Sequence, residues 1–239
     1  MSYTFNPASS QYAYRTASVP VTGQSTFTFL AWVKITDSAI DKHIFALSEL
    51  AHGHQDYVKL AQNGDDYFAY GHRDSVVDGS YFNNCGAMGG SGKEYDTWHL
   101  IGLRKNADDT LEGFLNGTWG GAAVAACEPY YACDQLRIGA TWVPDKYLYG
   151  KIAYAAFHSA ALSNSDFTAL LTADPRTHST ASSRIACWDL TSAHSAGSFA
   201  DSVGSYTLTT SGSPAYDADN PTVFGTPTVT MGRCIYILP

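Results

Sequence analysis

The sequence has few basic residues for its length. Lysine and arginine number 14 against 22 aspartates and glutamates, which gives a formal net charge of −8 at pH 7. Affinity for nucleic acids comes mainly from basic side chains that neutralise phosphates, so this balance argues against a DNA- or RNA-binding surface. No run of basic residues favours an anionic membrane surface either. We therefore expect no nucleic-acid partner.

Targeting and spanning segments are also missing. The start, MSYTFNPASS, has no basic region followed by an apolar one, so we expect no signal peptide and synthesis in a cytoplasm. No apolar run reaches 18 residues, so we expect no membrane insertion. None of the cysteines has a C-x2-C spacing, which argues against a zinc ribbon. We interpret them as small buried side chains, although Cys127 and Cys133 could close a loop in an oxidising compartment.

The residues that are abundant indicate β-structure. The chain has 16 Tyr, 11 Phe and 21 Gly, and only 15% of its residues are charged. Short apolar segments alternate with turns rich in Gly, Asn, Asp and Ser, which predicts many short strands. FTFLAWVKI, residues 27–35, is apolar on both faces and is therefore predicted to lie between two layers. LSNSDFTALLTADP, residues 162–175, predicts the only helix, with Ser163 as its N-cap.

Two further segments complete the expected organisation. Residues 78–96 are rich in Gly and Asn and are predicted to form an exposed loop. From residue 213 onwards the sequence contains four prolines, which suit an extended arm better than a central strand. We expect an all-β protein, a two-sheet antiparallel sandwich or a barrel, with one domain over residues 1–212 and a Pro-rich arm over 213–239.

The order of four motifs resembles a known superfamily. FTFLAWVKI, the hairpin DTWHLIGLRKNADDTLEGFLNGTW, LRIGA and YGKIAYAAFHSAALSNSDFTALL resemble successive segments of the laminin-G-like and pentraxin-like jelly rolls, the concanavalin A-like superfamily. The resemblance implies a two-sheet antiparallel jelly roll. Many relatives carry an acidic, often calcium-binding, residue where this chain has Ala153. No cofactor is therefore expected, although calcium stays open at two turns, with Asp65, Asp66, Asp108 and Asp109 as candidate ligands.

Hydrolases and lyases share this fold, but their motifs are missing here. The paired carboxylates of an E-x-D-x-x-E strand are absent, and the chain contains only four glutamates. The Gln-x-His strand of the lyases is absent as well. The alternating His52, His54 and Asp56 suggest a metal site, but Gly53 between them favours an exposed hairpin loop. We expect a protein that is not an enzyme, with a polysaccharide hydrolase or lyase as a weaker alternative.

Aromatic residues near presumed loops are the remaining functional feature. Sugar rings stack on aromatic faces, and tyrosine adds a hydroxyl. The candidate glycan-binding residues are Tyr81, Phe82, Tyr130, Tyr131, Trp142 and Tyr147. Half of such aromatics could equally be packing residues.

Two functional hypotheses follow. Small laminin-G-like modules with such a start and arm resemble bacteriophage decoration and tail-fibre proteins, which implies a homo-oligomer in a virion, with virion proteins as partners. The arm would then dock on a neighbour by strand addition, through Pro221, Pro227, Ile235, Tyr236, Ile237 and Leu238. The alternative is a lectin-like module that binds a cell-surface glycan.

Overall fold

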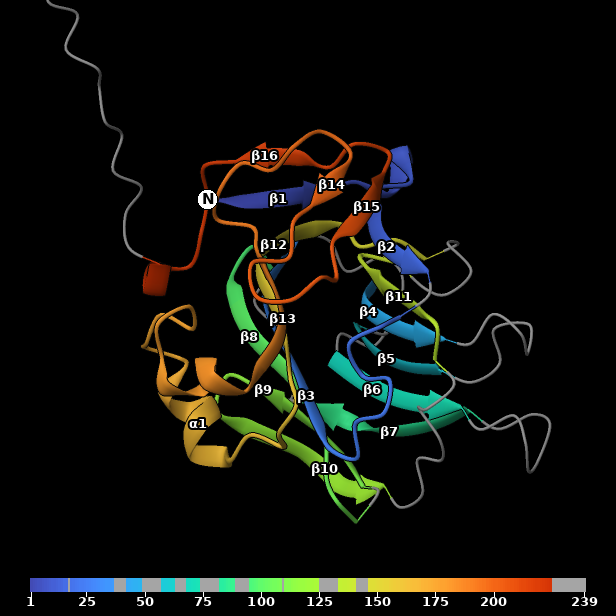
Figure 1. Ribbon diagram of the computed structural model, residues 1–239. Helices are drawn as coiled ribbons and strands as arrows, with labels where there is room; N and C mark the ends of the chain where they lie inside the picture. Colours follow the sequence, from blue (N-terminus) through green and yellow to red (C-terminus); the bar gives the residue numbers. More distant parts are fainter. Residues whose placement is uncertain are drawn as a thin grey trace, which may run out of the picture.

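In the computed structural model, the chain forms two antiparallel sheets packed face to face (Figure 1). The structure describes residues 1–16, 18–36, 42–48, 57–62, 68–73, 82–88, 95–108, 110–124, 133–140 and 146–224. The predicted two-sheet jelly-roll sandwich is confirmed.

Sheet A has eight strands in the order β10-β9-β8-β3-β12-β1-β16, and β13 pairs with β12 beside β1. Its strands are β1 Ser2–Phe5, β3 Phe27–Ile35, β8 Trp98–Lys105, β9 Leu111–Leu115, β10 Thr118–Val124, β12 Gly150–His158, β13 Arg184–Asp189 and β16 Ala215–Asp217.

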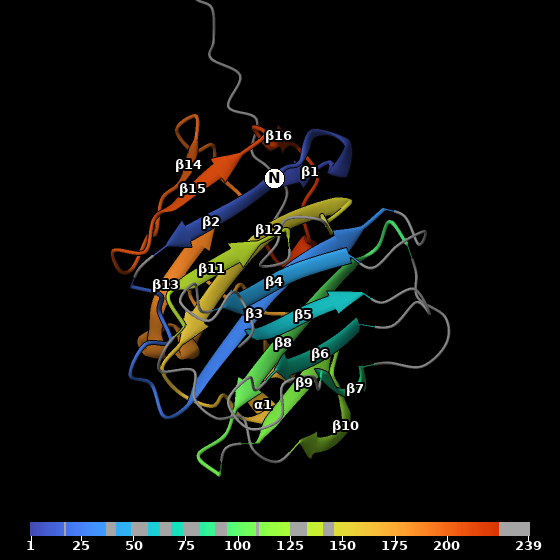
Figure 2. The ribbon, with the colours of Figure 1, turned by 90° about the vertical axis from the view of Figure 1, so that its right-hand side faces the viewer.

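Sheet B has eight strands in the order β14-β15-β2-β11-β4-β5-β6-β7. Figure 2 views this sheet nearly face on, with β2, β11, β4, β5, β6 and β7 side by side. Its strands are β2 Tyr12–Thr16, β4 Lys42–Ser48, β5 Tyr57–Gln62, β6 Phe68–Arg73, β7 Phe82–Met88, β11 Gln135–Ile138, β14 Ser198–Phe199 and β15 Leu208–Ser211.

Strand β3 contributes to two separate cores, as its sequence predicted. Phe29 and its alternate neighbours face sheet B, where the Phe29 ring stacks on Phe45 at a centroid distance of 4.2 Å. Leu30 and Trp32 face the opposite side and belong to a second apolar cluster on the outer surface of sheet A. Because both faces of β3 are covered, sheet A is a middle layer.

The predicted helix provides part of that cover. α1, Asn164–Ala169, begins with a capping box in which Ser163 and Asp166 satisfy each other's backbone N–H groups. Its Phe167 is fully buried and stacks on Phe114 at 4.4 Å between ring centroids. Figure 1 shows α1 on the side of sheet A that faces away from sheet B.

The hairpin between β8 and β9 and the tight turn after β9 also form as predicted. Asn116 and Gly117 both have positive φ, 46° and 90°, as a two-residue hairpin turn requires. The Asn116 side chain accepts a hydrogen bond from Leu100 N at 2.9 Å, and its Nδ2 lies 2.6 Å from Nδ1 of His99. His99 is buried, so it has a structural role here.

One expectation about a loop was wrong. Residues 78–96 were predicted to form an exposed loop, but Phe82–Met88 form β7, which pairs with β6 and ends sheet B. A strand needs only backbone partners to pair, so its Gly- and Asn-rich sequence did not prevent it from joining β6. An edge position also needs fewer apolar side chains than a central strand.

The segment expected to begin the arm lies against sheet A. β16 pairs antiparallel with β1, and the short 3₁₀ helix η4, Thr222–Phe224, packs on the outer apolar cluster. Pro221, directly before η4, is buried. The remaining predicted docking residues, Pro227, Ile235, Tyr236, Ile237 and Leu238, lie outside the described residues. A domain boundary at 213 and a docking role for the arm stay predictions.

Two of the cysteines have a defined burial in the structure. Cys133 and Cys187 are 5% and 1% exposed, as expected for small buried side chains. Cys127 lies outside the described residues, so the loop-closing alternative stays a prediction. In the described part of the chain, no helix is long and apolar enough to cross a membrane.

Candidate functional site

Most of the predicted glycan-binding residues cannot be placed. Tyr81, Tyr130, Tyr131 and Trp142 lie outside the described residues, and Phe82 is described only as the first position of β7. Tyr147 is described, at an isolated bridge to Ala140 just beyond the end of β11. This tyrosine lies in a group that the sequence alone did not bring together.

Tyr12, Tyr14, Arg137 and Tyr147 form what we call the tyrosine–arginine surface, on the outer face of sheet B. Alternation along the strands places them there. Ala13, between the two tyrosines of β2, is fully buried in the sandwich core, so its neighbours point to the opposite face. Arg137 of β11 has the same position between two core residues, Leu136 and Ile138. The register pairs Arg137 with Tyr14 directly across the two strands.

The four side chains of this surface are half-buried, and Tyr12 contacts each of the other three. The Tyr12 ring lies 5.6 Å from the Tyr14 ring and 6.0 Å from the Tyr147 ring, in tilted arrangements. The guanidinium carbon of Arg137 lies 5.6 Å from the centre of the Tyr12 ring, within range of a cation–π interaction. Burial lowers the pKa of Arg137, and the neighbouring tyrosines oppose that shift. Arg137 remains cationic at neutral pH because an arginine side chain cannot be deprotonated in a protein.

This arrangement has a defined binding chemistry. Tyrosine rings offer flat apolar faces for the C–H side of a sugar, and their hydroxyls offer hydrogen bonds at the ring edge. A guanidinium adds planar donors that suit a carboxylate or a pair of oxygen acceptors. Contacts between the rings and Arg137 hold the side chains in place before a ligand binds, which reduces the entropic cost of binding.

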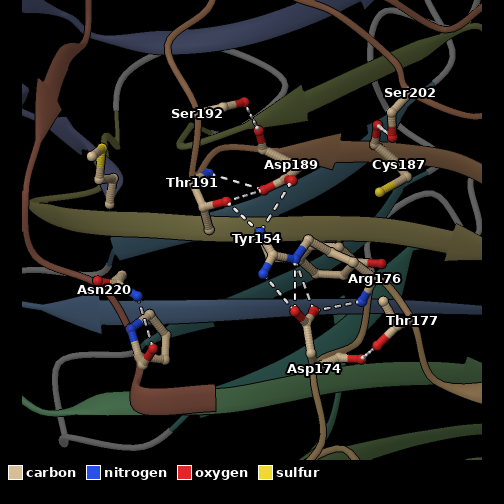
Figure 3. Close-up of polar contacts among 12 residues, drawn as sticks. Tyr154, Asp174, Arg176, Thr177, Cys187, Asp189, Thr191, Ser192, Ser202 and Asn220 are labelled. Atoms are coloured by element: carbon tan, nitrogen blue, oxygen red, sulfur yellow. Dashed lines mark hydrogen bonds and ion pairs between the residues drawn. The ribbon is translucent and has the colours of Figure 1, made fainter. Parts of the chain in front are cut away.

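A second polar cluster lies on the outer side of sheet A and is structural. Figure 3 shows Arg176 between Asp174, Asp189 and Thr191. The guanidinium binds both carboxylate oxygens of Asp174, donates to Thr191 Oγ1 at 3.0 Å, and lies 3.6 Å from Asp189 Oδ2. It also lies 5.0 Å from the centre of the Phe224 ring. These bonds hold the loop after α1 to the loop after β13 and to η4.

Arg184 extends this structural cluster into the outer core. It donates to the Arg176 carbonyl at 2.8 Å and to the Tyr154 hydroxyl at 3.2 Å. Burial raises the pKa of Tyr154 well above its usual range. Tyr154 is fully buried, so no ligand reaches it without opening the cover of sheet A.

The calcium candidates gain no partners among the described residues. Asp108 is exposed, and its Oδ1 accepts hydrogen bonds from the Thr110 backbone at 3.2 Å and from its hydroxyl at 2.7 Å. These bonds lower the pKa of Asp108 and close its own turn. Across the described ranges, no three His, Cys, Asp or Glu side chains gather as a metal site requires. Asp65, Asp66, Asp109 and the His52–Asp56 segment lie outside those ranges.

Comparison with known proteins identifies the fold. No protein-family model matches the chain, and no curated protein matches it. Solved structures do. A Bacteroides ovatus protein to which carbohydrate binding is provisionally assigned matches with a TM-score of 0.60 and 15% identity, over 87% of this chain and 57% of that one. This chain therefore spans little more than half of that protein's length.

Two other solved structures match over 66% of this chain. The CBM40 module of a Ruminococcus gnavus sialidase, bound to α2,3-sialyllactose, matches with a TM-score of 0.53 and 16% identity, over 66% of this chain and 91% of that one. A heptameric pentraxin from Limulus polyphemus matches with a TM-score of 0.52 and 12% identity, over 66% and 74%. At these identities the likeness concerns the fold, and it agrees with the predicted concanavalin A-like jelly roll.

Sequence reasoning missed three members of the tyrosine–arginine surface. Tyr12, Tyr14 and Arg137 each carry a local signal, because each is a polar or aromatic residue that alternates with core residues in a predicted strand. The pairing of β2 with β11 joins residues about 120 positions apart, which one sequence could not reveal. Tyr147 was predicted for its aromatic ring alone.

Proposed function

We propose that this protein is a non-catalytic glycan-binding module with a lectin-like role, and that the tyrosine–arginine surface contacts the sugar. The observation that carries the proposal is a group of three tyrosine rings on the outer face of a jelly-roll sheet, whose central ring, Tyr12, contacts the Arg137 guanidinium. Two of the similar structures support it, since one is provisionally assigned to carbohydrate binding and another holds sialyllactose.

The cation within this surface favours acidic glycans. The protein as a whole has a net charge of −8, which repels anions at long range. Short-range pairing of Arg137 with a sugar carboxylate acts within hydrogen-bond distance and is less affected by that field. We therefore expect carboxylated glycans to bind more tightly than neutral glycans of the same size at this surface.

A glycan array tests the proposal. Labelled protein is expected to give a defined set of signals, which R137A and the double variant Y12A/Y14A lose. R15A is the matched control, because Arg15 lies 5.5 Å from the Tyr206 ring in a similar Arg–Tyr pair elsewhere. Absence of any signal from the wild-type protein would contradict the proposal, and so would equal losses in R15A and R137A.

The absence of catalysis is part of the proposal. It rests on the missing carboxylate motif and on the use of Glu112, the only described glutamate, in structure. Glu112 Oε2 accepts hydrogen bonds from Arg104 at 2.6 Å and Asn106 at 2.7 Å. Release of reducing ends from any polysaccharide by the pure protein would overturn this part.

The virion decoration role predicted from the sequence stays untested. The Pro-rich arm is one of the three sequence features that favoured it, and residues 225–239 lie outside the described residues. None of the three similar structures named above is described as a virion protein. A homo-oligomer is compatible with both roles, and the mass of the pure protein in solution would test it.

A further inference from the structure

A small hollow lies at the end of the sandwich where the edge strands of the two sheets meet. It has a volume of about 250 Å³ and is lined from both sheets, by β1 and β16 of sheet A and by β14 and β15 of sheet B. Figure 1 shows these four strands together at one end of the molecule. None of the four residues of the tyrosine–arginine surface lines it.

The apolar part of the hollow is a fixed aromatic wall. Tyr3 is the centre of this wall, with ring centroids at 4.7 Å from Phe199, 5.2 Å from Tyr216 and 5.9 Å from His194. Tyr216 is 40% exposed, one of only two large hydrophobic residues in the described ranges that are this open to solvent. Solvent therefore reaches the Tyr216 ring, which packs against Tyr3 but is not enclosed.

Hydrogen bonds hold this wall in one position. The Tyr216 hydroxyl donates to the Thr191 carbonyl at 3.0 Å, and the Tyr3 hydroxyl accepts from His194 N at 2.7 Å. The His194 ring is fixed on both sides, since Nδ1 accepts from Ala200 N at 3.0 Å and Nε2 donates to the Asp189 carbonyl at 2.8 Å. A wall that is already ordered loses little entropy when a ligand binds.

Four of the lining residues carry aliphatic hydroxyl groups, and we call these four the rim of the hollow. Ser195, Ser198, Thr210 and Ser213 contribute them, and no lining residue is Lys, Arg, Asp or Glu. Ser213 has a φ of 51°, a conformation that a residue with a side chain rarely adopts. Gln11 holds that turn by donating to the carbonyls of Gly212 at 2.9 Å and Ser213 at 3.0 Å. Strained positions held in this way are often found at binding sites.

We infer that this hollow binds a single uncharged pyranose ring. The apolar face of the sugar stacks on Tyr216, and its hydroxyls bond to the serine and threonine hydroxyls of the rim. The volume lies below the roughly 300–1,000 Å³ of sites for drug-sized ligands, so one ring fits and an extended chain does not. The absence of charged residues in the lining disfavours carboxylated sugars, because a desolvated charge needs a partner.

An NMR titration with methyl glycosides, followed through the ligand signals and through the backbone amide signals of the protein, tests the inference. The probes are the methyl glycosides of glucose, galactose, mannose, N-acetylglucosamine, N-acetylgalactosamine and fucose, with methyl glucuronide as the charged counterpart. At least one neutral glycoside is expected to bind in the millimolar range and more tightly than the glucuronide. Its binding is expected to shift backbone amide signals within 194–199 and 210–216.

Variants place the binding at the hollow. Y216A is expected to weaken binding at least tenfold, whereas V203A, which shortens the other exposed large hydrophobic residue, leaves it unchanged. R137A is also expected to leave it unchanged, which separates this site from the proposed glycan surface. The inference is overturned if no neutral glycoside binds, if the glucuronide binds as tightly, or if the amide shifts lie elsewhere. The amide shifts need no variant, so the test holds even if Y216A fails to fold.

Discussion

Asp219 accepts a hydrogen bond from the indole Nε1 of Trp98 at 3.1 Å. This bond joins the segment after β16 to the start of β8, residues 121 positions apart. The same carboxylate binds Lys34 Nζ at 3.0 Å and Lys151 Nζ at 3.1 Å. One side chain therefore ties the segment after β16 to three strands of sheet A.

The first prediction concerns acid stability. Burial alone raises the pKa of Asp219, but hydrogen bonds from Trp98, Lys34 and Lys151 lower it to about 2. A carboxyl group with a lowered folded-state pKa stabilises the fold above its ordinary pKa of 3.8, and this contribution is lost as the pH falls towards 2. Because the side chain is 32% exposed, we expect D219N to cost about 1 kcal/mol at pH 7.

Urea unfolding at pH 7 and at pH 2.5 measures this effect. The difference between wild type and D219N is expected to shrink at the lower pH. D96N is the control, because Asp96 is exposed at a turn. A difference that stays constant across this range would show that Asp219 does not contribute through its charge.

The second prediction concerns Gly102 of β8. A Cβ at this position would lie 2.3 Å from Cε1 of Phe167, the buried residue of α1. G102A should therefore displace α1 from sheet A and cost roughly 1–3 kcal/mol, as overpacked cores do. Thermal unfolding of G102A, F167L and the double variant measures the coupling. In the double variant, the smaller side chain of F167L should make room for the added Cβ and recover part of the stability lost in G102A. If the losses of the two single variants simply add in the double variant, the contact between the two positions is contradicted.

The third prediction concerns the buried His158. Burial, and then the charge of Arg184, lower the pKa of His158 to about 4. Its Nδ1 lies 2.9 Å from Ser183 Oγ, and its buried Nε2 has no hydrogen-bond partner among the residues that the structure describes. In the unfolded chain the His158 imidazole takes up a proton near pH 6.5, whereas in the folded protein it stays neutral down to about pH 4. Protonation therefore favours the unfolded chain between these two values, so the protein is fully stable above pH 6.5 and loses stability as the pH falls towards 4. The free energy of unfolding falls by up to roughly 3 kcal/mol over this range because of His158.

H158N removes the titration and retains a donor towards Ser183. Its free energy of unfolding should be lower at pH 7 but less dependent on pH between 6.5 and 5, a range in which most carboxyl groups remain ionised. Equal slopes in the two proteins would show that His158 does not cause the pH dependence.

Local signals in the sequence predicted the elements that have strong patterns. β3 was predicted with its bounds and with both faces buried, because its apolar residues leave no polar face. The helix cap at Ser163 and the turn at Asn116 were also predicted, since each depends on residues within four positions. Strand β7 was missed because its pairing with β6 comes from the backbone, which composition does not report.

The candidate sites depend on long-range pairing, which the sequence does not show. Tyr147 was predicted as an isolated aromatic, but its ring partner Tyr12 lies on β2, and Arg137, which contacts Tyr12, lies on β11. The hollow brings Tyr3 together with Tyr216 from the opposite end of the chain. No local period connects these positions, so only the folded structure reveals that they are neighbours.

The last prediction concerns residues 213–224, and two truncated chains isolate it. A chain ending at Phe224 keeps β16, the Asp217 and Asp219 ion pairs and η4, whereas a chain ending at Gly212 loses all of them. The shorter chain also exposes the edge of β1 and part of the outer apolar cluster. Both chains lack residues 225–239, so any difference between them belongs to 213–224.

We expect the chain ending at Gly212 to be less stable by several kcal/mol, since it loses a strand pairing, buried apolar area and charge-assisted hydrogen bonds together. Urea unfolding measures the difference, and hydrogen exchange at the β1 amides locates it. Equal unfolding midpoints and unchanged protection of β1 would mean that the domain is complete at residue 212, as the sequence first suggested. A large loss would instead place the end of the folded unit beyond residue 212, because the strand and the ion pairs that follow it would then be part of its stable core.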